Sequence, residues 1–440
     1  KMMTGQSIAD GVPTLETGVL VDSGGGTEVD IRANVDEELL AKLAELNATI
    51  IDSAPQYRSI VVRLPLDQLE TIAAMDEVIF IQPNFRANVW KNANGVDVPH
   101  PVNFWQNNYH PFPILNQSSK PTFADRARRV RTFLDDQLTQ SGSVTSQGDT
   151  THQANLARST IGPDGTGIKI GVLSDGVVSL AASQALGDLG PVTVLPGQTG
   201  SGDEGTAMLE IIHDLAPGAQ LYFATADPTI SRFAQNVRDL RSAGCDIIID
   251  DVFYFVESPF QDGQAPAVVS NTNGGIVTQA VKDVATAGAL YFSSAGNQGN
   301  QDDNTASCYQ GDFVNGGALA AVPGGNVHNF GGGVQSDLIQ TGSGNAIDLY
   351  WSDPLGASTN DYDLFVLNNA LTSVLSSSTN TQNGTQDPFE QAGSNASGNR
   401  IVVLQKTGAA NRFLHITINA NGTGKLGTST NGTTKGHSIA

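Results

Sequence analysis

Short apolar runs alternate with amphipathic segments between residues 165 and 300. The runs cover 168–173, 192–195, 220–224, 247–249 and 290–293, and segments with helical spacing lie near 202–215, 230–243 and 275–287. Strands that are apolar along their whole length are typical of a parallel sheet that helices cover on both faces. The region therefore predicts an α/β fold with a doubly wound parallel sheet, in which chemistry lies beyond the carboxyl ends of the strands.

Residues 27–87 show a different order of elements. Helices are predicted at 36–46 and from Pro65 onward, because Pro is favoured at the first position of a helix. Strands are predicted at 29–31, 49–51, 59–64 and 78–81. The resulting order, βαββαβ, predicts a small ferredoxin-like α+β domain. Residues 1–26 are polar and rich in Gly, which predicts a flexible lead-in.

Two further regions differ in composition. Residues 88–150 are rich in Pro and Asn and predict a linker that carries a surface helix at 123–138. In residues 326–432, Asn, Gly and Ser turns separate strands predicted at 347–351, 362–366, 400–404 and 413–418. This pattern favours an antiparallel β-sandwich. The α/β domain is expected to cover 151–325 and to resume at 433–440, which makes the sandwich an insertion.

The charge of the chain limits its partners. It has 44 acidic and 23 basic side chains, a net charge of −21. Nucleic acids and anionic membrane surfaces would repel such a chain and are excluded as partners. No apolar run reaches the ~18 residues of a membrane-spanning helix. With 15% charged residues and 48 glycines, the composition is typical of exported proteins, and we expect a secreted or cell-surface location.

The two cysteines, Cys245 and Cys308, are too few for a disulfide framework. Cys245 lies beside the apolar run 247–249, which favours a buried thiol. A bridge between the two cysteines remains open at this point.

Three short motifs place polar side chains where strands end or a helix begins. Asp175 directly follows the first apolar run, and Asn297 lies in a Gly-flanked turn after the last one. Glu204 opens a helix between them. Each position also has a structural interpretation: a strand-end turn acid, a turn amide and, for Glu204, the second member of a capping box that begins at Ser201.

The order and spacing of these motifs resemble the subtilase family of serine peptidases over roughly residues 150–300. That family has an Asp after its first core strand, a His-Gly-Thr helix followed by Ala-Pro, and an Ala-Gly-Asn turn whose Asn donates to the oxyanion. The resemblance implies that Asp175 and Asn297 are the first and third of these elements. It also implies that residues 27–87 are a propeptide that inhibits the enzyme and assists its folding.

One position departs from the family pattern, because Glu204 stands where subtilases have His. The related sedolisins use Glu there, in a Ser-Glu-Asp triad. They carry a second acid one helical turn later, where this chain has Met208, and their oxyanion donor is Asp rather than Asn. The resemblance thus implies a hybrid site with Asp175, Glu204 and Asn297 as catalytic residues.

The helix that Glu204 opens is expected to turn one apolar face inward. That face would consist of Ala207, Met208, Ile211, Ile212 and Leu215. Glu204 lies one turn before it, on the same side. Burial and a neighbouring Asp175 would raise the pKa of Glu204, and the helix N-terminus would lower it by less. We therefore expect the fastest reaction below neutral pH.

The family nucleophile is the Ser of a Gly-Thr-Ser that opens a buried helix. In this chain Gly-Thr-Ser at 427–429 is followed by Thr-Asn-Gly, which is a turn sequence, so Ser429 is not expected to be the nucleophile. We expect the nucleophile beyond residue 440 of the parent protein, and the chain, which opens on Lys1 without a signal peptide, to be a fragment. Polypeptides are the expected substrates.

Asp250, Asp251 and Val252 follow a central strand and are expected to line the substrate cleft. The two acids would either select basic side chains or cap loops. In the predicted sandwich, calcium binding by Asp353, Asp361 and Asp363 competes with their interpretation as solvated turn acids. No cofactor is predicted.

A second hypothesis comes from a different functional class. Absence of the His and of the Ser motif also fits a non-catalytic pseudopeptidase whose sandwich binds glycans or surface proteins. The coding sequence after codon 440 distinguishes the two hypotheses. A Gly-Thr-Ser helix motif there favours the enzyme, and a stop codon favours the scaffold.

Overall fold

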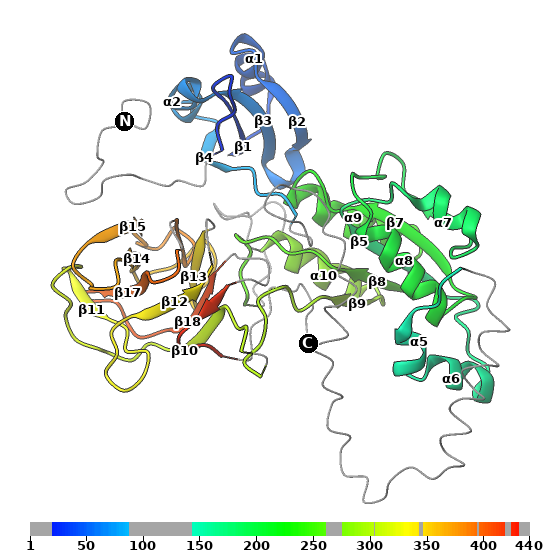
Figure 1. Ribbon diagram of the computed structural model, residues 1–440. Coiled ribbons are helices and arrows are strands. Elements are labelled where there is room, and N and C mark those ends of the chain that lie inside the picture. Colours follow the sequence, from blue (N-terminus) through cyan, green and yellow to red (C-terminus); the bar gives the residue numbers. More distant parts are fainter. Residues whose placement is uncertain are drawn as a thin grey trace, which may run out of the picture. The chain divides into compact units, whose positions relative to one another are not determined.

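The computed structural model describes residues 20–87, 143–260, 275–302, 304–342, 346–393, 396–418 and 424–430 (Figure 1). Most of the predicted lead-in, the surface helix at 123–138 and the segment 433–440 lie outside these residues. Contacts divide the chain into two compact units, one drawn from 1–88, 226–239 and 250–440 and the other from 89–225 and 240–249. Each unit is described by itself.

A mixed α/β architecture with a parallel sheet is present, as the sequence predicts. The sheet has the order β6-β7-β5-β8-β9, and both β5 and β6 run parallel to β7. Its strands are β5 (Lys169–Ser174), β6 (Val192–Val194), β7 (Gln220–Thr225), β8 (Ile247–Asp250) and β9 (Leu290–Ser293). Within the sheet, β6 and β7 lie on one side of β5, and β8 lies on the other side. The carboxyl end of β5 is therefore a topological switch point, where sheets of this class bind ligands.

Along the sequence, helices lie before and between these strands. Three lie where the sequence predicts them: α8 (Glu204–Leu215), α9 (Ile230–Ser242) and α10 (Ile276–Thr286). Three others were not predicted: α5 (Gln147–Thr151), α6 (Ala154–Ile161) and α7 (Leu180–Leu186). These are short, and few of their side chains are buried, so they lack the periodic apolar stripe that identifies a helix in a sequence.

The N-terminal domain has its own hydrophobic core. Its elements are β1 (Gly26–Ala33), α1 (Glu37–Glu45), β2 (Thr49–Ala54), η2 (Pro55–Tyr57), β3 (Ser59–Pro65), η3 (Leu66–Gln68), α2 (Leu69–Ala73) and β4 (Val78–Pro83). The strands form an antiparallel sheet in the order β2-β3-β1-β4. Asp36 caps α1 by accepting the backbone N–H groups of Glu38 and Leu39. The core joins Val29, Ile31, Ala33, Leu39, Leu43, Ile60, Val62, Leu64 and Ile72.

Residues 308–430 form two antiparallel sheets that share one core, and we name them the double-sheet domain. One sheet has the order β10-β18-β13-β16, and the other contains β15-β14-β17-β12-β19 with β11 beside β17. The strands are β10 (Cys308–Asp312), β11 (Gly325–Val327), β12 (Asp337–Thr341), β13 (Ile347–Trp351), β14 (Tyr362–Leu367), β15 (Val374–Ser378), β16 (Phe389–Ala392), β17 (Arg400–Lys406), β18 (Phe413–Ile418) and β19 (Lys425–Leu426).

The four strands predicted for this domain are its apolar inner ones. β13, β14, β17 and β18 supply most of the shared core, including the fully buried Trp351. β10 begins well before residue 326, the start expected from the sequence, and pairs with β18 from Cys308 to Asp312. Its sequence, Cys-Tyr-Gln-Gly-Asp, lacks an apolar alternation because Gly311 and two polar residues interrupt it.

Glu390 and Asp337 of the double-sheet domain are buried and accept hydrogen bonds from uncharged donors. Glu390 is fully buried and accepts from Ser378, from Asn380 at 3.0 Å and from Gln382 at 2.9 Å. Burial raises the pKa of Glu390 to about 8. Asp337 accepts the backbone N–H of Thr428 at 2.8 Å, and burial raises the pKa of Asp337 to about 7.

We predict that the double-sheet domain loses stability as the pH rises. A carboxyl group whose pKa is raised by folding binds more protons in the folded state, so its stabilising contribution is complete below its unfolded pKa, near ~4. The contribution is then lost up to the folded pKa, about 8 for Glu390. The Glu390→Gln variant should show a free energy of unfolding that depends less on pH, by up to about 1.4 kcal/mol per unit.

Urea denaturation followed by the fluorescence of Trp351, with Trp90 and Trp105 replaced by Phe, measures this domain alone. The Glu210→Gln control, on α8 outside the domain, should leave the pH dependence of the transition unchanged. Equal slopes for the wild type and Glu390→Gln between pH 5 and 8 would contradict the prediction.

Candidate active site

Asp175 lies at the switch point of the parallel sheet. It follows β5 directly and is 1% exposed. Its backbone carbonyl accepts the Thr225 hydroxyl, at the end of β7, at 2.9 Å and the Ser201 N–H at 3.0 Å. The residue is thus fixed by the neighbouring strand and by the loop before α8.

The carboxylate of Asp175 faces the first turn of α8. Its Oδ1 accepts the backbone N–H of Glu204 at 3.1 Å. Gly202, at φ +138°, passes so close that a Cβ there would lie 2.0 Å from Oδ2 of Asp175. The positive end of a helix stabilises a carboxylate in this position. The structure therefore brings Asp175 and the start of the Glu204 helix together.

Glu204 is the first residue of α8, and Asp203 is its N-cap. Asp203 is held by Ser179, whose N–H and hydroxyl both donate to it at 2.6 Å, and by the Thr206 hydroxyl at 3.1 Å. The capping box that would begin at Ser201 is not formed, because this network starts the helix later. The interpretation of Glu204 as the second member of a capping box with Ser201 at the N-cap is therefore wrong.

The inward face of α8 also differs from the prediction. Ala207 is exposed and Ile211 is 49% exposed, although both were expected inside. Leu209 is fully buried instead, between Ile170, Val172 and Phe223 in one cluster. Met208 and Ile212 pack against that cluster as expected.

Gly205 explains why the buried face is displaced. A Cβ at this position would lie 2.4 Å from the Phe223 ring and 2.6 Å from the Gly176 carbonyl oxygen. The first turn of α8 therefore touches the sheet through a residue without a side chain. This close approach turns the stripe from Gly205 to Leu209 inward and leaves Glu204 partly buried at its margin.

Asn297 belongs to the other compact unit, in the turn after β9. It is partly buried, and the next residue, Gln298, has a backbone carbonyl that accepts the N–H and hydroxyl of Ser307 at 2.8 and 3.1 Å. The turn is thereby anchored just after Asn297.

Asp250 ends β8 and points into the protein. It is 2% exposed, and its carboxylate accepts the Tyr291 hydroxyl at 2.5 Å and the Ser293 hydroxyl at 2.6 Å. Val252 is fully buried, whereas Asp251 is partly exposed. The two hydroxyl partners were not predicted, although Tyr291 and Ser293 alternate on β9 as side chains of one face do.

Ser429 lies in a segment without helix or strand after β19, near the end of the double-sheet domain. Its carbonyl accepts the Gln301 side chain at 2.5 Å, and the preceding Thr428 is bound to Asp337. These contacts hold the described residues around Ser429, and its exclusion as nucleophile stays a prediction from the sequence.

Both cysteines are buried thiols, and no disulfide joins Cys245 to Cys308. Burial raises the pKa of the Cys245 thiol to about 11. A thiol that stays protonated at physiological pH is inert, which agrees with a structural role.

The three acids considered for calcium face other partners. Asp353 accepts from Arg412 and from Asn360. Asp361 accepts the Gln382 N–H at 3.4 Å, and Asp363 pairs with Lys406 at 3.2 Å. No cluster of three or more His, Cys, Asp or Glu side chains that could hold a metal occurs among the described residues. None of the helices in the described ranges has the length and apolar character of a membrane span.

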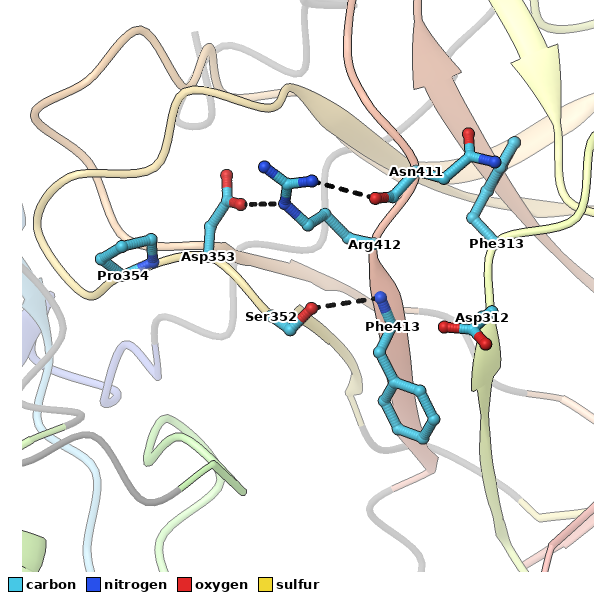
Figure 2. A pocket seen from close by; sticks show the side chains of 8 residues that line it. All are labelled: Asp312, Phe313, Ser352, Asp353, Pro354, Asn411, Arg412 and Phe413. Carbon is cyan, nitrogen blue, oxygen red and sulfur yellow. Dashed lines mark hydrogen bonds and ion pairs between the residues drawn. The ribbon is translucent and has the colours of Figure 1, made fainter.

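A hollow of about 550 Å³ opens on the double-sheet domain, with Asp353 among its lining residues (Figure 2). Arg412 lies across it and binds Asp353, and the Phe413 N–H donates to the Ser352 hydroxyl at 3.1 Å. The lining residues are Asp312, Phe313, Ser352, Asp353, Pro354, Asn411, Arg412 and Phe413. We assign this hollow no part in the candidate active site.

Comparison with known proteins finds no matching family model and no matching curated protein. Solved structures of serine proteases do match. The CspB protease of Clostridium perfringens is 11% identical, with a TM-score of 0.36 over 64% of this chain and 68% of that one.

The epidermin leader peptide processing protease EpiP of Staphylococcus aureus is 9% identical (TM-score 0.32; 63% and 62% covered). Fervidolysin of Fervidobacterium pennivorans, a keratinolytic enzyme related to subtilisin, is 13% identical (TM-score 0.29; 65% and 41% covered). These likenesses are too distant to assign a function, which is argued from the residues below.

We predict that Gly205→Ala weakens the docking of α8. The added Cβ would overlap the Phe223 ring and the Gly176 carbonyl, and overpacking of this kind costs about 1–3 kcal/mol. The higher helix propensity of Ala, about 1 kcal/mol, offsets only part of this cost. Urea denaturation followed by far-ultraviolet circular dichroism should show a lower midpoint. Gly190→Ala is the matched control, since its Cβ would meet only His213 at 3.6 Å. A Gly205→Ala protein as stable as the wild type would contradict the prediction.

Proposed function

We propose that the protein is an exported serine endopeptidase of the subtilase kind in which a carboxylate replaces the usual imidazole base. The observation that carries the proposal is the contact between Asp175 and the first residue of α8. A buried acid at the switch point accepts the N–H of Glu204 at 3.1 Å, so that two carboxyl-bearing residues adjoin at the end of a central strand.

In the proposed reaction a serine hydroxyl attacks the scissile carbonyl carbon. Glu204 accepts the hydroxyl proton and returns it to the leaving amine, while Asp175 orients the start of the Glu204 helix. The side-chain NH₂ of Asn297 stabilises the oxyanion, a contribution of about 3–4 kcal/mol in such sites. Ser429 does not fit the role of nucleophile, and the proposal assigns that role to no described residue.

Substrate recognition is proposed to occur beside β8. Asp251 is the partly exposed acid of the pair at its end and would select basic side chains, and the buried Asp250 and Val252 would support that edge of the cleft from within. Polypeptides are the proposed partners. The pseudopeptidase alternative rests on the missing His and Ser motifs of the sequence, and we do not favour it.

We predict a rate maximum below neutral pH. A carboxyl group ordinarily titrates near ~4.3 and an imidazole near ~6.5, so a carboxylate base is available in more acid solution. Glu204→Gln should lower kcat by about 10²–10⁴. The pH dependence of peptide hydrolysis by the natural full-length protein tests this, and a fluorophosphonate probe with peptide mapping identifies the serine.

Glu210→Gln, on the same helix, is the matched control and should leave kcat unchanged. An ascending limb near pH 6.5 that is retained in Glu204→Gln would remove Glu204 from the mechanism.

The N-terminal domain is proposed to be a ferredoxin-like propeptide, and the double-sheet domain an inserted β-sandwich. The N-terminal domain contacts α9 directly. Asp52 pairs with Arg232 at 2.6 Å and accepts the Thr229 hydroxyl at 2.9 Å. The Tyr57 hydroxyl accepts from Arg238 at 2.9 Å and donates to Gln235 at 3.0 Å.

The domain also has a hydrophobic core of its own, built from residues between Val29 and Ile72. We predict that residues 20–87, added as a separate polypeptide, inhibit the mature enzyme. Asp52→Asn should raise the inhibition constant about tenfold or more, because a charge-assisted contact is lost. Asp67→Asn, at an exposed position, is the control and should have no effect. No inhibition at high molar excess would count against a propeptide role.

A further inference from the structure

We propose that Asp250 is a positioning residue that holds the turn carrying Asn297 in place. The inference rests on the proposed function for the role of Asn297 as oxyanion donor. It concerns a side chain that the sequence places at the substrate cleft and that the structure turns toward β9.

Asp250 binds the end of β9 through three separate atoms. Its Oδ2 accepts the Tyr291 hydroxyl at 2.5 Å, and its Oδ1 accepts the Ser293 hydroxyl at 2.6 Å. Its backbone carbonyl accepts the Ser294 N–H at 3.1 Å. Both carboxylate oxygens and the main chain of one residue therefore fix the last residues before the turn.

The two hydroxyl groups come from one face of β9. Side chains two residues apart on a strand point the same way, and the alternate residues, Leu290 and Phe292, are 59% and 54% exposed. Burial, followed by the charge of Asp250, raises the pKa of Tyr291 well above its ordinary value. Tyr291 thus remains a hydrogen-bond donor to Asp250 across the acid and neutral range.

The turn is anchored on its far side as well. The carbonyl of Gln298 accepts two bonds from Ser307, and Asn300 and Thr305 close the following loop with bonds of 3.0 and 3.1 Å. Asn297 therefore lies between two fixed points, Ser294 and Gln298. An oxyanion donor acts by being held in position before charge develops, and Asp250 supplies the hold on one side.

In this arrangement the Asp250 carboxylate binds other side chains of the protein rather than a substrate. With 2% of its surface exposed and both oxygens bonded to hydroxyl groups, its carboxylate has little surface left to offer a substrate. Of the two adjacent acids, Asp251 is the one that remains for recognition, and Asp250 acts through Asn297.

A double-mutant cycle in the natural full-length protein tests the inference. Asn297→Ala should lower kcat about 10²–10³-fold. Asp250→Ala should lower kcat about 10- to 100-fold, because a donor displaced by about 1 Å loses most of its effect, and KM should change less than twofold. In the double variant kcat should be no lower than in Asn297→Ala alone. A multiplicative loss in the double variant, or a loss confined to KM, would overturn the role of Asp250.

The hydrogen–deuterium exchange of residues 294–300 gives a readout that needs no activity. In Asp250→Ala these residues should exchange faster than in the wild type. If that variant does not fold, Tyr291→Phe and Ser293→Ala replace it in the experiment, and each should increase the exchange to a smaller extent. Asp246→Asn is the matched control and should change neither kcat nor this exchange. Asp246 lies at the opposite end of β8, where its carboxylate accepts the Lys169 N–H at 3.0 Å.

The two arms separate the failure of the inference from that of the proposed function. If the wild type hydrolyses no peptide and labels with no probe, the proposed function fails, and with it the oxyanion purpose of the turn. Faster exchange in Asp250→Ala would then still show that Asp250 holds the turn. Unchanged exchange overturns the inference whether or not the protein is active.

Discussion

The hydrogen bond from the Glu204 amide to the Asp175 carboxylate joins the start of α8 to the end of β5. Two features depend on it. A buried carboxylate needs donors, and here a helix N-terminus supplies one together with a favourable dipole. The bond also requires the loop before α8 to pass very close to Asp175, which Gly202 permits. The backbone of the first helical residue, Glu204, is then held at the switch point.

The end of β9 and the start of α8 are organised by carboxylates that accept from hydroxyl groups or backbone amides. Asp250 accepts from Tyr291 and Ser293, and Asp203 accepts from Ser179. Such bonds avoid the cost of an unpaired buried charge without a cation. They also leave the geometry of each turn dependent on a single acid, because one carboxylate can fix two neighbouring residues at once.

Much of the fold was predictable because its central strands are apolar throughout. β5, β7 and β18 lie where the sequence places them, whereas β10 and α7 carry too few periodic apolar residues to be identified. For the site, position along the chain was predictable and orientation was not. The inward face of α8 was misjudged because Gly205, rather than a large apolar residue, makes the contact with Phe223.

The partners of Asp250 could not be predicted for a related reason. Tyr291 and Ser293 belong to a strand whose apolar neighbours dominate its pattern, and hydroxyl groups on a strand do not reveal which carboxylate they meet. Their alternation, two residues apart, was the available signal. It becomes informative only when the order of the sheet is known.

Protonation links the double-sheet domain to the proposed chemistry. Glu390 and Asp337, with pKa values raised to about 8 and about 7, favour acid solution. His328 sets a limit in the other direction. Its Nδ1 accepts the Val314 N–H at 3.1 Å, which requires a neutral ring, and burial lowers its pKa to about 4. A group with a lowered basic pKa contributes stability above ~6.5 that is lost as the pH falls to the folded value. Glu390 and Asp337 thus favour the acid side of this range, where a carboxylate base would also work, and His328 opposes them between about pH 4 and ~6.5.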